Sequence, residues 1–291
     1  MSSIYFINLI INGLIEGMVI ALPALALTLV LDISKFPNVT VGDTMSVGAY
    51  AALAFQSVGV PYFFLSVGGA MVACMVLSLA TYYFVFRKLT RAPMVVNLLA
   101  SVGLAFMMRS VLQLNVSSQP QTYDFPLVRA WNFGGIRILP TDLWVLLTTI
   151  VTLLIVFAIF RYTDLGRRLR AIADNPELAR ASAIRPRYPT IFLWCLFGAL
   201  SALGGVLIAS KSVLLPEFGW EFIIPAFSAV ILGGIGNPVG AVLGAVIMGI
   251  AQELSIAFVG PSYKITIAFA VMIAVLLVRP AGLLGTPEKA R

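Results

Sequence analysis

A basic segment of 27 residues, 161–187, separates two apolar segments that contain no charged residue. It holds seven of the chain's 19 lysines and arginines. The flanking segments, 143–160 and 192–209, are 18 residues each, close to the roughly 20 residues that cross a bilayer core as a helix. Because short loops rich in Lys and Arg remain in the cytoplasm, the sequence predicts two membrane spans joined by a cytoplasmic loop.

The composition extends this interpretation to the whole chain. Hydrophobic residues make up 60% of the 291 residues and charged residues only 11%, against about 25% charged in soluble domains. A soluble fold of this size cannot bury so much apolar surface, which predicts a single all-α integral membrane domain over 1–291. There is no histidine, and Cys74 and Cys195 both lie in apolar segments. We therefore expect no catalytic residue, no metal site and no disulfide framework.

Basic clusters between the apolar segments predict the topology. The apolar segments are 5–31, 44–57, 61–86, 94–114, 143–160, 192–209, 223–235, 239–257 and 262–278. The basic clusters are Arg87, Lys88 and Arg91, then 161–187, then Arg279, Lys289 and Arg291. If all three are cytoplasmic, a bundle of about 8–9 spans has its N-terminus outside and its C-terminus in the cytoplasm. The N-terminus has no basic segment before its apolar residues, so we expect a retained first span. The net charge of +7 comes from basic residues between the predicted spans, so no nucleic-acid partner is expected.

Two apolar segments are too short for full spans. Segments 44–57 and 223–235 have about 14 and 13 residues, nearer to half-helices. The second ends in the glycine- and proline-rich turn 233–238, which breaks any helix. Short broken helices in both halves of a chain are typical of an internal repeat around a translocation path. The alternative is that one or both are simple hairpin turns.

The longest polar connection, 115–142, is expected on the outer side. It is either a landing surface for an external partner or an ordinary interfacial loop anchored by Trp131.

The basic loop itself shows a helical pattern. Leu165, Leu169 and Ile172 form an apolar stripe at i, i+4 and i+7. Asn175 followed by Pro176 is a strong helix start, because asparagine caps a helix and proline suits its first position. We expect two short helices at the cytoplasmic surface, docked either into a groove of another protein or against anionic lipid.

A few polar residues lie inside apolar segments, where they are usually functional. Asn12 and Glu16 are one turn apart in the first segment, and Asn97 and Ser101 form a similar stripe in 94–114. We expect these four to line a substrate path, although Asn97 and Ser101 would serve equally as hydrogen bonds between helices.

Other positions favour structural roles. Arg109 and Glu253 are expected near an interface or in a structural role, and Gly13 with Gly17 at a close helix contact.

Several segments, in order along nearly the whole chain, resemble the permease of bacterial branched-chain amino acid ABC transporters. Glu177-Leu178-Ala179 with Ala183 is similar to the loop by which ABC importer permeases dock onto the ATP-binding subunit. The other matching segments are Asn12-Gly13-Leu14, Gly48-Ala49-Tyr50, Leu165-Gly166-Arg167, Asn175-Pro176-Glu177, residues 230–236, and Arg279-Pro280-Ala281-Gly282-Leu283. Two departures are that segment 35–43 has no histidine and that Ala183 replaces the usual glycine.

The resemblance implies the permease subunit of an importer for branched-chain or other small amino acids. Its implied partners are a second homologous permease, two ATP-binding cassette subunits and a periplasmic binding protein, in the bacterial inner membrane among membrane lipid. The coupling residues it implies are Leu165, Leu169, Ile172, Asn175, Pro176, Glu177, Leu178 and Ala179. The chain has no Walker motif, so no cofactor is expected on it and ATP hydrolysis belongs to the partners. The alternatives are a secondary transporter or a passive channel for a small neutral solute.

Overall fold

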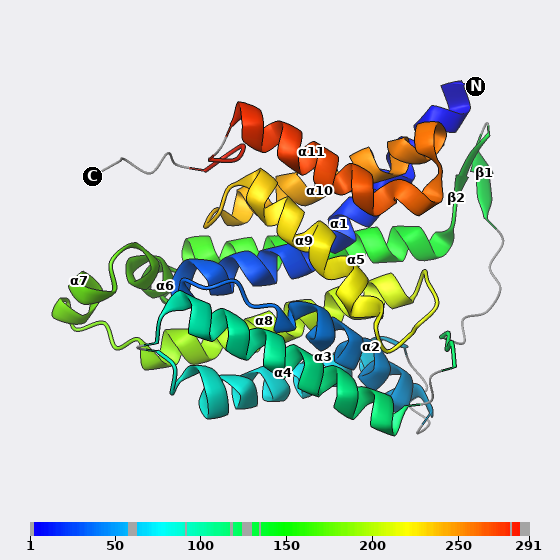
Figure 1. Cartoon of the computed structure of the whole chain (residues 1–291). Helices are drawn as coiled ribbons and strands as arrows, with labels where there is room; N and C mark the ends of the chain where they lie inside the picture. Colours follow the sequence, from blue (N-terminus) through cyan, green and yellow to red (C-terminus); the bar gives the residue numbers. More distant parts are fainter. Residues whose placement is uncertain are drawn as a thin grey trace.

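The computed structural model describes residues 3–57, 63–90, 92–116, 119–123, 130–133, 135–279 and 281–285. The basic residues Arg91, Lys289 and Arg291, Pro280 of the matching C-terminal segment and parts of the outer connection 115–142 lie outside these ranges. Within them the molecule is an elongated bundle of helices with one small hairpin (Figure 1).

Six helical segments of the described residues are long and apolar enough to cross a membrane. They belong to α1 (Ser3–Ser34), α3 (Phe63–Thr81) with the π-helix η1 (Tyr82–Phe86), α4 (Met94–Asn115), α5 (Pro140–Tyr162), α8 (Arg187–Ala209) and α10 (Pro238–Val259). The shorter helices are α2 (Thr40–Ser57), α6 (Asp164–Asp174), α7 (Pro176–Ala181), α9 (Phe218–Gly233), η2 (Pro261–Tyr263) and α11 (Lys264–Val278). The all-helical polytopic membrane fold is confirmed, and the number of spans stays a prediction.

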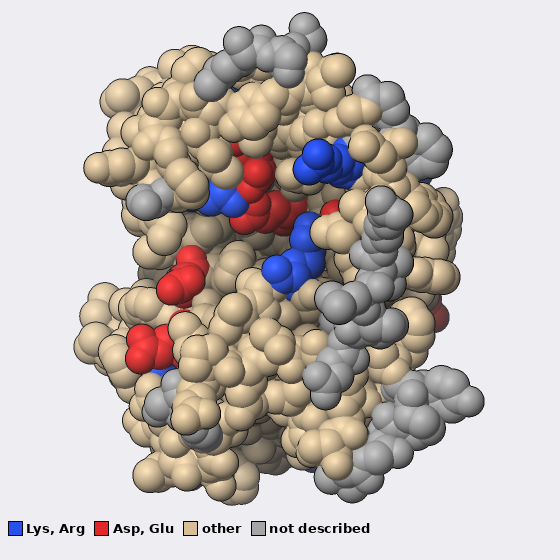
Figure 2. All heavy atoms as spheres, turned by 90° about the vertical axis from the view of Figure 1, so that its right-hand side faces the viewer, with Lys and Arg blue, Asp and Glu red and all other residues tan. Residues whose placement is uncertain are grey.

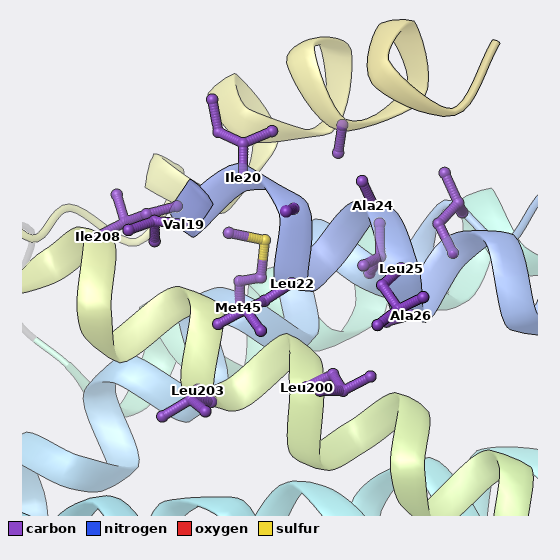
Figure 3. Packing of buried hydrophobic residues seen from close by; sticks show 14 of the residues in the cluster. Val19, Ile20, Leu22, Ala24, Leu25, Ala26, Met45, Leu200, Leu203 and Ile208 are labelled. Atoms are coloured by element: carbon purple, nitrogen blue, oxygen red, sulfur yellow. The ribbon is translucent and has the colours of Figure 1, made fainter. Parts of the chain in front are cut away.

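Helices α1 and α8 form the centre of the bundle. Within the most apolar window of each, 78% of the residues are buried, against 17% in α4, so α4 lies at the periphery of the bundle. Figure 3 shows Leu22 and Leu25 of α1 close to Leu200 of α8, with Met45 of α2 beside them. These apolar side chains are buried, and their packing holds α1 against α8.

Small residues allow α1 to approach α10 very closely. A Cβ atom on Gly13 would lie 2.7 Å from Cα of Ile250, and one on Gly17 would lie 2.7 Å from the carbonyl oxygen of Ala245. Real side chains do not tolerate such distances. Gly13 and Gly17 therefore lie at a helix contact, as expected for small residues spaced four apart.

The two short segments are longer as helices than their apolar stretches suggested. Helix α2 has 18 residues and α9 has 16, because each begins with polar or aromatic residues before its apolar part. Helix α2 begins inside the protein, where buried Asn38 accepts a hydrogen bond from the Thr40 backbone N–H at 3.1 Å. The non-helical stretch 35–39 therefore separates α1 from a helix that begins inside the protein.

The turn between α9 and α10 follows the sequence signals. Gly234, directly after α9, has a φ of +105°, which favours glycine. Asn237 then caps α10, since its side chain accepts a hydrogen bond from the Gly240 backbone N–H at 3.0 Å, and Pro238 is the first helical residue.

One end of the bundle, which we name the loop end, carries α6 and α7 (Figure 1). The described basic residues of all three predicted clusters gather there. Arg187 donates a hydrogen bond to the Tyr83 hydroxyl at 3.3 Å, which brings the basic loop beside Arg87. The backbone N–H of Leu283, shortly after Arg279, bonds to the carbonyl of Leu232 at 2.8 Å, near the turn that ends α9.

The opposite end, the hairpin end, carries β1 (Trp131–Phe133) and β2 (Ile136–Ile138), paired antiparallel. This hairpin lies in the connection 115–142, for which the sequence predicted no strands. Asn8 of α1 holds it: the side-chain amide donates to the Gly135 carbonyl at 3.1 Å, and its oxygen accepts from the Arg137 backbone N–H at 3.1 Å.

Tyr123 anchors an earlier part of the same connection. Its hydroxyl donates to the carbonyl of Ala49 at 2.7 Å, and burial raises the pKa of Tyr123.

Candidate functional site

The main candidate site is a cavity of about 400 Å³ at the hairpin end, which we name the paired-charge cavity. Its lining residues are Asn12, Glu16 and Val19 of α1, Leu139 and Asp142 at the start of α5, Ile208, Lys211 and Ser212 at the end of α8, Phe222 of α9, Glu253 of α10 and Lys264 of α11. Figure 2 shows acidic and basic side chains gathered in a hollow on this end of the molecule.

Lys264 bridges two acidic residues of the cavity. Its Nζ donates to Glu16 Oε2 at 3.0 Å and also contacts Glu253 Oε1. These groups come from three helices, and Lys264 and Glu16 are 248 residues apart in sequence. The short helix η2 turns the chain after α10, so that the first residue of α11 faces back toward α1. The Lys264 bridge therefore links α1 with α10 and α11.

A second ion pair lies on the other side of the cavity. Lys211 Nζ lies 2.7 Å from Asp142 Oδ1, and the Asp142 side chain is 7% exposed. Lys211 follows the end of α8, and Asp142 lies in the first turn of α5, where a carboxylate also interacts favourably with the helix dipole. The cavity therefore carries three carboxylates and two ammonium groups, with both signs of charge on facing helices.

The remaining wall of the cavity is apolar. Val19 and Ile208 are buried, and Leu139 and Phe222 extend the same surface. Asn12 lines both this cavity and a neighbouring one of about 400 Å³ under the hairpin, whose lining includes Arg137. The two cavities share Asn12 as a lining residue.

The structure separates the four residues predicted to line a path. Asn12 and Glu16 lie together in the paired-charge cavity, whereas Asn97 and Ser101 do not. The Asn97 amide donates to the Ala92 carbonyl at 3.4 Å, and the Ser101 hydroxyl accepts from the Val39 backbone N–H at 3.3 Å. Ser101 thus joins α4 to the stretch before α2, the interhelical alternative considered for this pair.

Arg109 forms a buried ion pair. Its Nε donates to Asp43 Oδ1 at 3.0 Å and its Nη2 donates to Asp43 Oδ2 at 3.3 Å. The guanidinium carbon also lies 4.7 Å from the centre of the Trp220 ring, within cation–π range. Arg109 therefore connects α4 with α2 and α9.

In the basic loop, the apolar stripe faces the permease itself. Leu169 and Ile172 are buried, and Leu165 is half-buried, so they pack α6 onto the ends of the membrane helices. Asn175 caps α7 as predicted, accepting from the backbone N–H groups of Glu177 and Leu178.

The surface that this loop presents outward comes from the second helix. The Leu178 side chain is 64% exposed, Pro176 and Glu177 are exposed, and Ala179 is buried.

Sequence reasoning missed most of the ion-pair residues. Lys264 was counted within the apolar segment 262–278, and Asp142 and Lys211 were taken as part of loops. A lysine inside an apolar segment is itself a signal, since such residues are rare at membrane depth unless paired. The sequence did not show its partners, because Glu16 and Glu253 meet Lys264 only through tertiary packing.

Comparison with known proteins shows what the chain resembles. Residues 9–276 match the family model described as branched-chain amino acid transport system permease component. The high-affinity branched-chain amino acid transport system permease protein LivH of Escherichia coli K12 is 28% identical, with 98% of this chain and 97% of LivH covered. The ribose import permease protein RbsC of the same strain is 26% identical, with 94% and 86% covered.

Among solved structures, PsaBC from Streptococcus pneumoniae in complex with Fab has a similar fold. The TM-score is 0.50 at 16% identity, and the match covers 93% of this chain and 91% of that one.

Proposed function

Since the chain belongs to the family of permease components of branched-chain amino acid transport systems, we propose that it carries branched-chain or other small amino acids as one subunit of an ABC importer. As a multi-pass inner-membrane protein it supplies the path, and it works with a second homologous permease, two ATP-binding subunits and a periplasmic binding protein. Because the sequence has no Walker motif, we expect the energy to enter through the ATP-binding partners.

The paired-charge cavity is the observation that carries the substrate proposal. An amino acid has an ammonium group, a carboxylate and, for leucine or valine, an aliphatic side chain. The cavity offers the carboxylates of Glu16 and Glu253, the ammonium groups of Lys211 and Lys264, and an apolar wall. Ion pairs that rearrange around a zwitterion keep every charge neutralised, which avoids leaving an unpaired charge in an apolar surrounding. An uncharged sugar has no ionic groups that could pair with these charged side chains.

The basic loop is the proposed contact with the ATP-binding subunit. Glu177 and Leu178 form the exposed surface that docks, and the buried Leu169 and Ile172 hold α6 rigidly against the membrane helices. A movement of the docked subunit then shifts the ends of α1, α5 and α8, which α6 contacts.

The proposed orientation places the loop end in the cytoplasm and the hairpin end, with the N-terminus, outside. Positive charge stays on the cytoplasmic side, and the described basic clusters share the loop end. The test uses a background without Cys74 and Cys195. Ser182→Cys should be shielded from a membrane-impermeant thiol reagent in intact cells, whereas Glu217→Cys near the hairpin end should react. Labelling of Ser182→Cys from outside would overturn the orientation.

The function is tested by reconstituting the permease with its partner subunits in liposomes and measuring uptake of leucine. Uptake should require ATP and the binding protein, and isoleucine and valine should compete whereas ribose should not. Lys211→Gln should raise the half-saturating concentration of loaded binding protein or lower the rate, and the exposed Lys88→Gln should do neither. Uptake without ATP would favour a passive channel or a secondary transporter, and transport of ribose in place of leucine would refute the substrate class.

A further inference from the structure

A third cavity, of about 570 Å³, lies at the loop end and has no role in the proposed passage of substrate. We name it the basic cavity. Its lining residues are Ile33, Ser34, Lys35, Phe36, Tyr82, Phe86, Arg87, Thr90, Ala92, Met94, Asn97, Ile172, Pro176, Arg180, Pro186, Arg187, Thr190 and Trp194. Four of these carry a positive charge and none carries a negative charge.

Aromatic rings form one wall of the basic cavity. Phe86 stacks between Phe36, at 5.0 Å between ring centres, and Trp194, at 4.9 Å. Tyr82 lies 5.5 Å from the Trp194 ring. Tyr82 and Phe86 are the first and last residues of the π-helix η1, a rare conformation that is frequent at functional sites. This wall is flat, apolar and rigid.

Two arginines meet at the rim without a negative charge between them. The guanidinium carbon of Arg87 lies 4.8 Å from the centre of the Tyr83 ring, and Arg187 donates to the hydroxyl of the same tyrosine at 3.3 Å. Arg180 of α7 lines the cavity as well. In the described part of the chain, none of these three arginines has a carboxylate within ion-pair distance. Like charges held together in this way favour an anion from outside the chain.

A buried hydrogen-bond donor adds a second, independent observation. Trp194 is 1% exposed, and its indole N–H has no acceptor among the described residues. Buried polar groups almost always have a partner, so the described residues leave one donor unsatisfied on a residue that lines the cavity.

The surroundings of the cavity identify the source of that anion. Met94, which lines the cavity, is 54% exposed, and Phe84 and Val95, close in sequence to lining residues, are 73% and 64% exposed. On a membrane protein these side chains contact acyl chains. A ligand whose phosphate binds the arginines and whose hydrocarbon chains lie along α3 and α4 would match both the basic cavity and the exposed apolar side chains. Basic pockets between membrane helices on the cytoplasmic side bind anionic lipid head groups.

We propose that the basic cavity is a binding site for an anionic phospholipid of the cytoplasmic leaflet, with the phosphate held by Arg87, Arg180 and Arg187 beside the Phe36–Phe86–Trp194 wall. The site rests on the geometry of the loop end and not on the identity of the transported substrate. Since α7 supplies Arg180 and Pro176, the bound lipid joins the basic loop to η1 and α8.

The test measures lipid retention by the purified full chain. The protein is placed in phosphatidylcholine nanodiscs containing phosphatidylglycerol, extracted mildly, and examined by native mass spectrometry for retained lipid. The parent should retain phosphatidylglycerol over phosphatidylcholine. The double variant Arg87→Gln with Arg187→Gln should weaken this retention roughly tenfold or more, because each basic residue near an anionic lipid contributes measurably to binding.

The matched control is Arg167→Gln with Arg168→Gln, which removes two exposed arginines of the same loop that do not line the cavity. It should retain phosphatidylglycerol like the parent. Arg180→Gln, which removes one exposed arginine of the cavity, should weaken retention several-fold and serves if the double variant unfolds. Equal loss in the control, or parental retention in both site variants, would overturn the site. Displacement of phosphatidylglycerol by inorganic phosphate at physiological concentration would overturn the lipid as its source.

Discussion

The two ends of this molecule differ in how their charged side chains are paired. At the hairpin end, Lys264 bridges Glu16 and Glu253, and Lys211 pairs with Asp142. At the loop end, the arginines around Tyr83 stand beside aromatic rings without a described carboxylate partner. The charges at the hairpin end are paired within the chain, whereas these arginines have no ion-pair partner among the described residues.

This difference follows from what each end has to contact. A charge at membrane depth is tolerated when it is paired or faces water, and removing one partner of a buried pair costs far more than the pair contributes. Charges along a path must therefore be matched before and after the substrate passes. In the proposed orientation, charges at the loop end face anionic lipid and the proposed partner subunits, where excess positive charge is stable.

The largest effect is expected at the most deeply buried ion pair. The side chains of Asp43 and Arg109 are 2% and 12% exposed. Asp43→Leu leaves the Arg109 guanidinium without its bidentate partner and should destabilise the protein by about 3–5 kcal/mol. The measurement is thermal unfolding of the purified protein in detergent, followed by size-exclusion chromatography.

The double variant Asp43→Leu with Arg109→Met is the control for this prediction. It removes both charges together, and replacing a buried pair with apolar residues is often nearly neutral. It should recover most of the lost stability. A double variant as unstable as Asp43→Leu would mean that packing around α2 and not charge pairing decides the result.

The buried Asp43–Arg109 pair also shows where sequence reasoning reaches its limit. The sequence predicted the apolar segments, the helix start at Asn175 and the break at 233–238, because each depends on neighbours within a few residues. It gave Arg109 either a place near an interface or a structural role, and it did not assign Asp43 a partner. Those two residues are 66 positions apart, and nothing in either local pattern specifies that they meet.

The same limit applied to the candidate site: patterns within one helix were visible in the sequence, and contacts between helices were not. Glu16 with Asn12 was identified because one polar stripe on an apolar helix is visible in the sequence. Asn97 with Ser101 gave an equally clear stripe, yet it faces α2 and the loop end, because the direction of a stripe depends on where the helix packs. The strands beside Gly135 were missed because a hairpin of three residues per strand is too short to show periodicity.

The next effect is expected at the loop end. Leu178 is 64% exposed at the proposed contact with the ATP-binding subunit. Leu178→Arg places a charge in that contact and should weaken association by about 2 kcal/mol or more, roughly thirtyfold, while the permease still inserts. Co-purification of the ATP-binding subunit and ATP-dependent uptake are the measurements. Arg168→Leu, at an exposed position on α6, is the control for a change of charge in the same loop. Normal uptake with an intact complex in Leu178→Arg would remove the coupling role.

A smaller effect is expected in the paired-charge cavity, because Lys264 has two acidic partners. Glu16→Gln keeps a hydrogen-bond acceptor and leaves Glu253 on Lys264, so the protein should assemble and the uptake rate should fall several-fold. Glu16→Leu should reduce it further, since losing a hydrogen bond to a charged group costs about 1–3 kcal/mol. Glu217→Gln, at an exposed position outside the cavity, should match the parent. If Glu16→Leu transports as fast as the parent at equal expression, the cavity is not part of the path.

The smallest effect is expected at a second Asp–Arg pair, in which Arg167 contacts Asp164 on the exposed surface of α6. The hydrogen bond and charge of Arg167 lower the pKa of Asp164. A lowered pKa means that the pair stabilises the fold above the unfolded pKa of about 4 and loses this contribution as the pH falls through the folded pKa.

Water and salt screen an exposed pair, so Asp164→Asn at pH 7 should shift thermal unfolding far less than Asp43→Leu, and high salt should abolish the shift. Thr163→Ala removes the cap that accepts from the Gly166 N–H and should cost about 1 kcal/mol, more than the loss of Asp164. A shift for Asp164→Asn as large as that for Asp43→Leu would show that burial does not explain the difference between the two pairs.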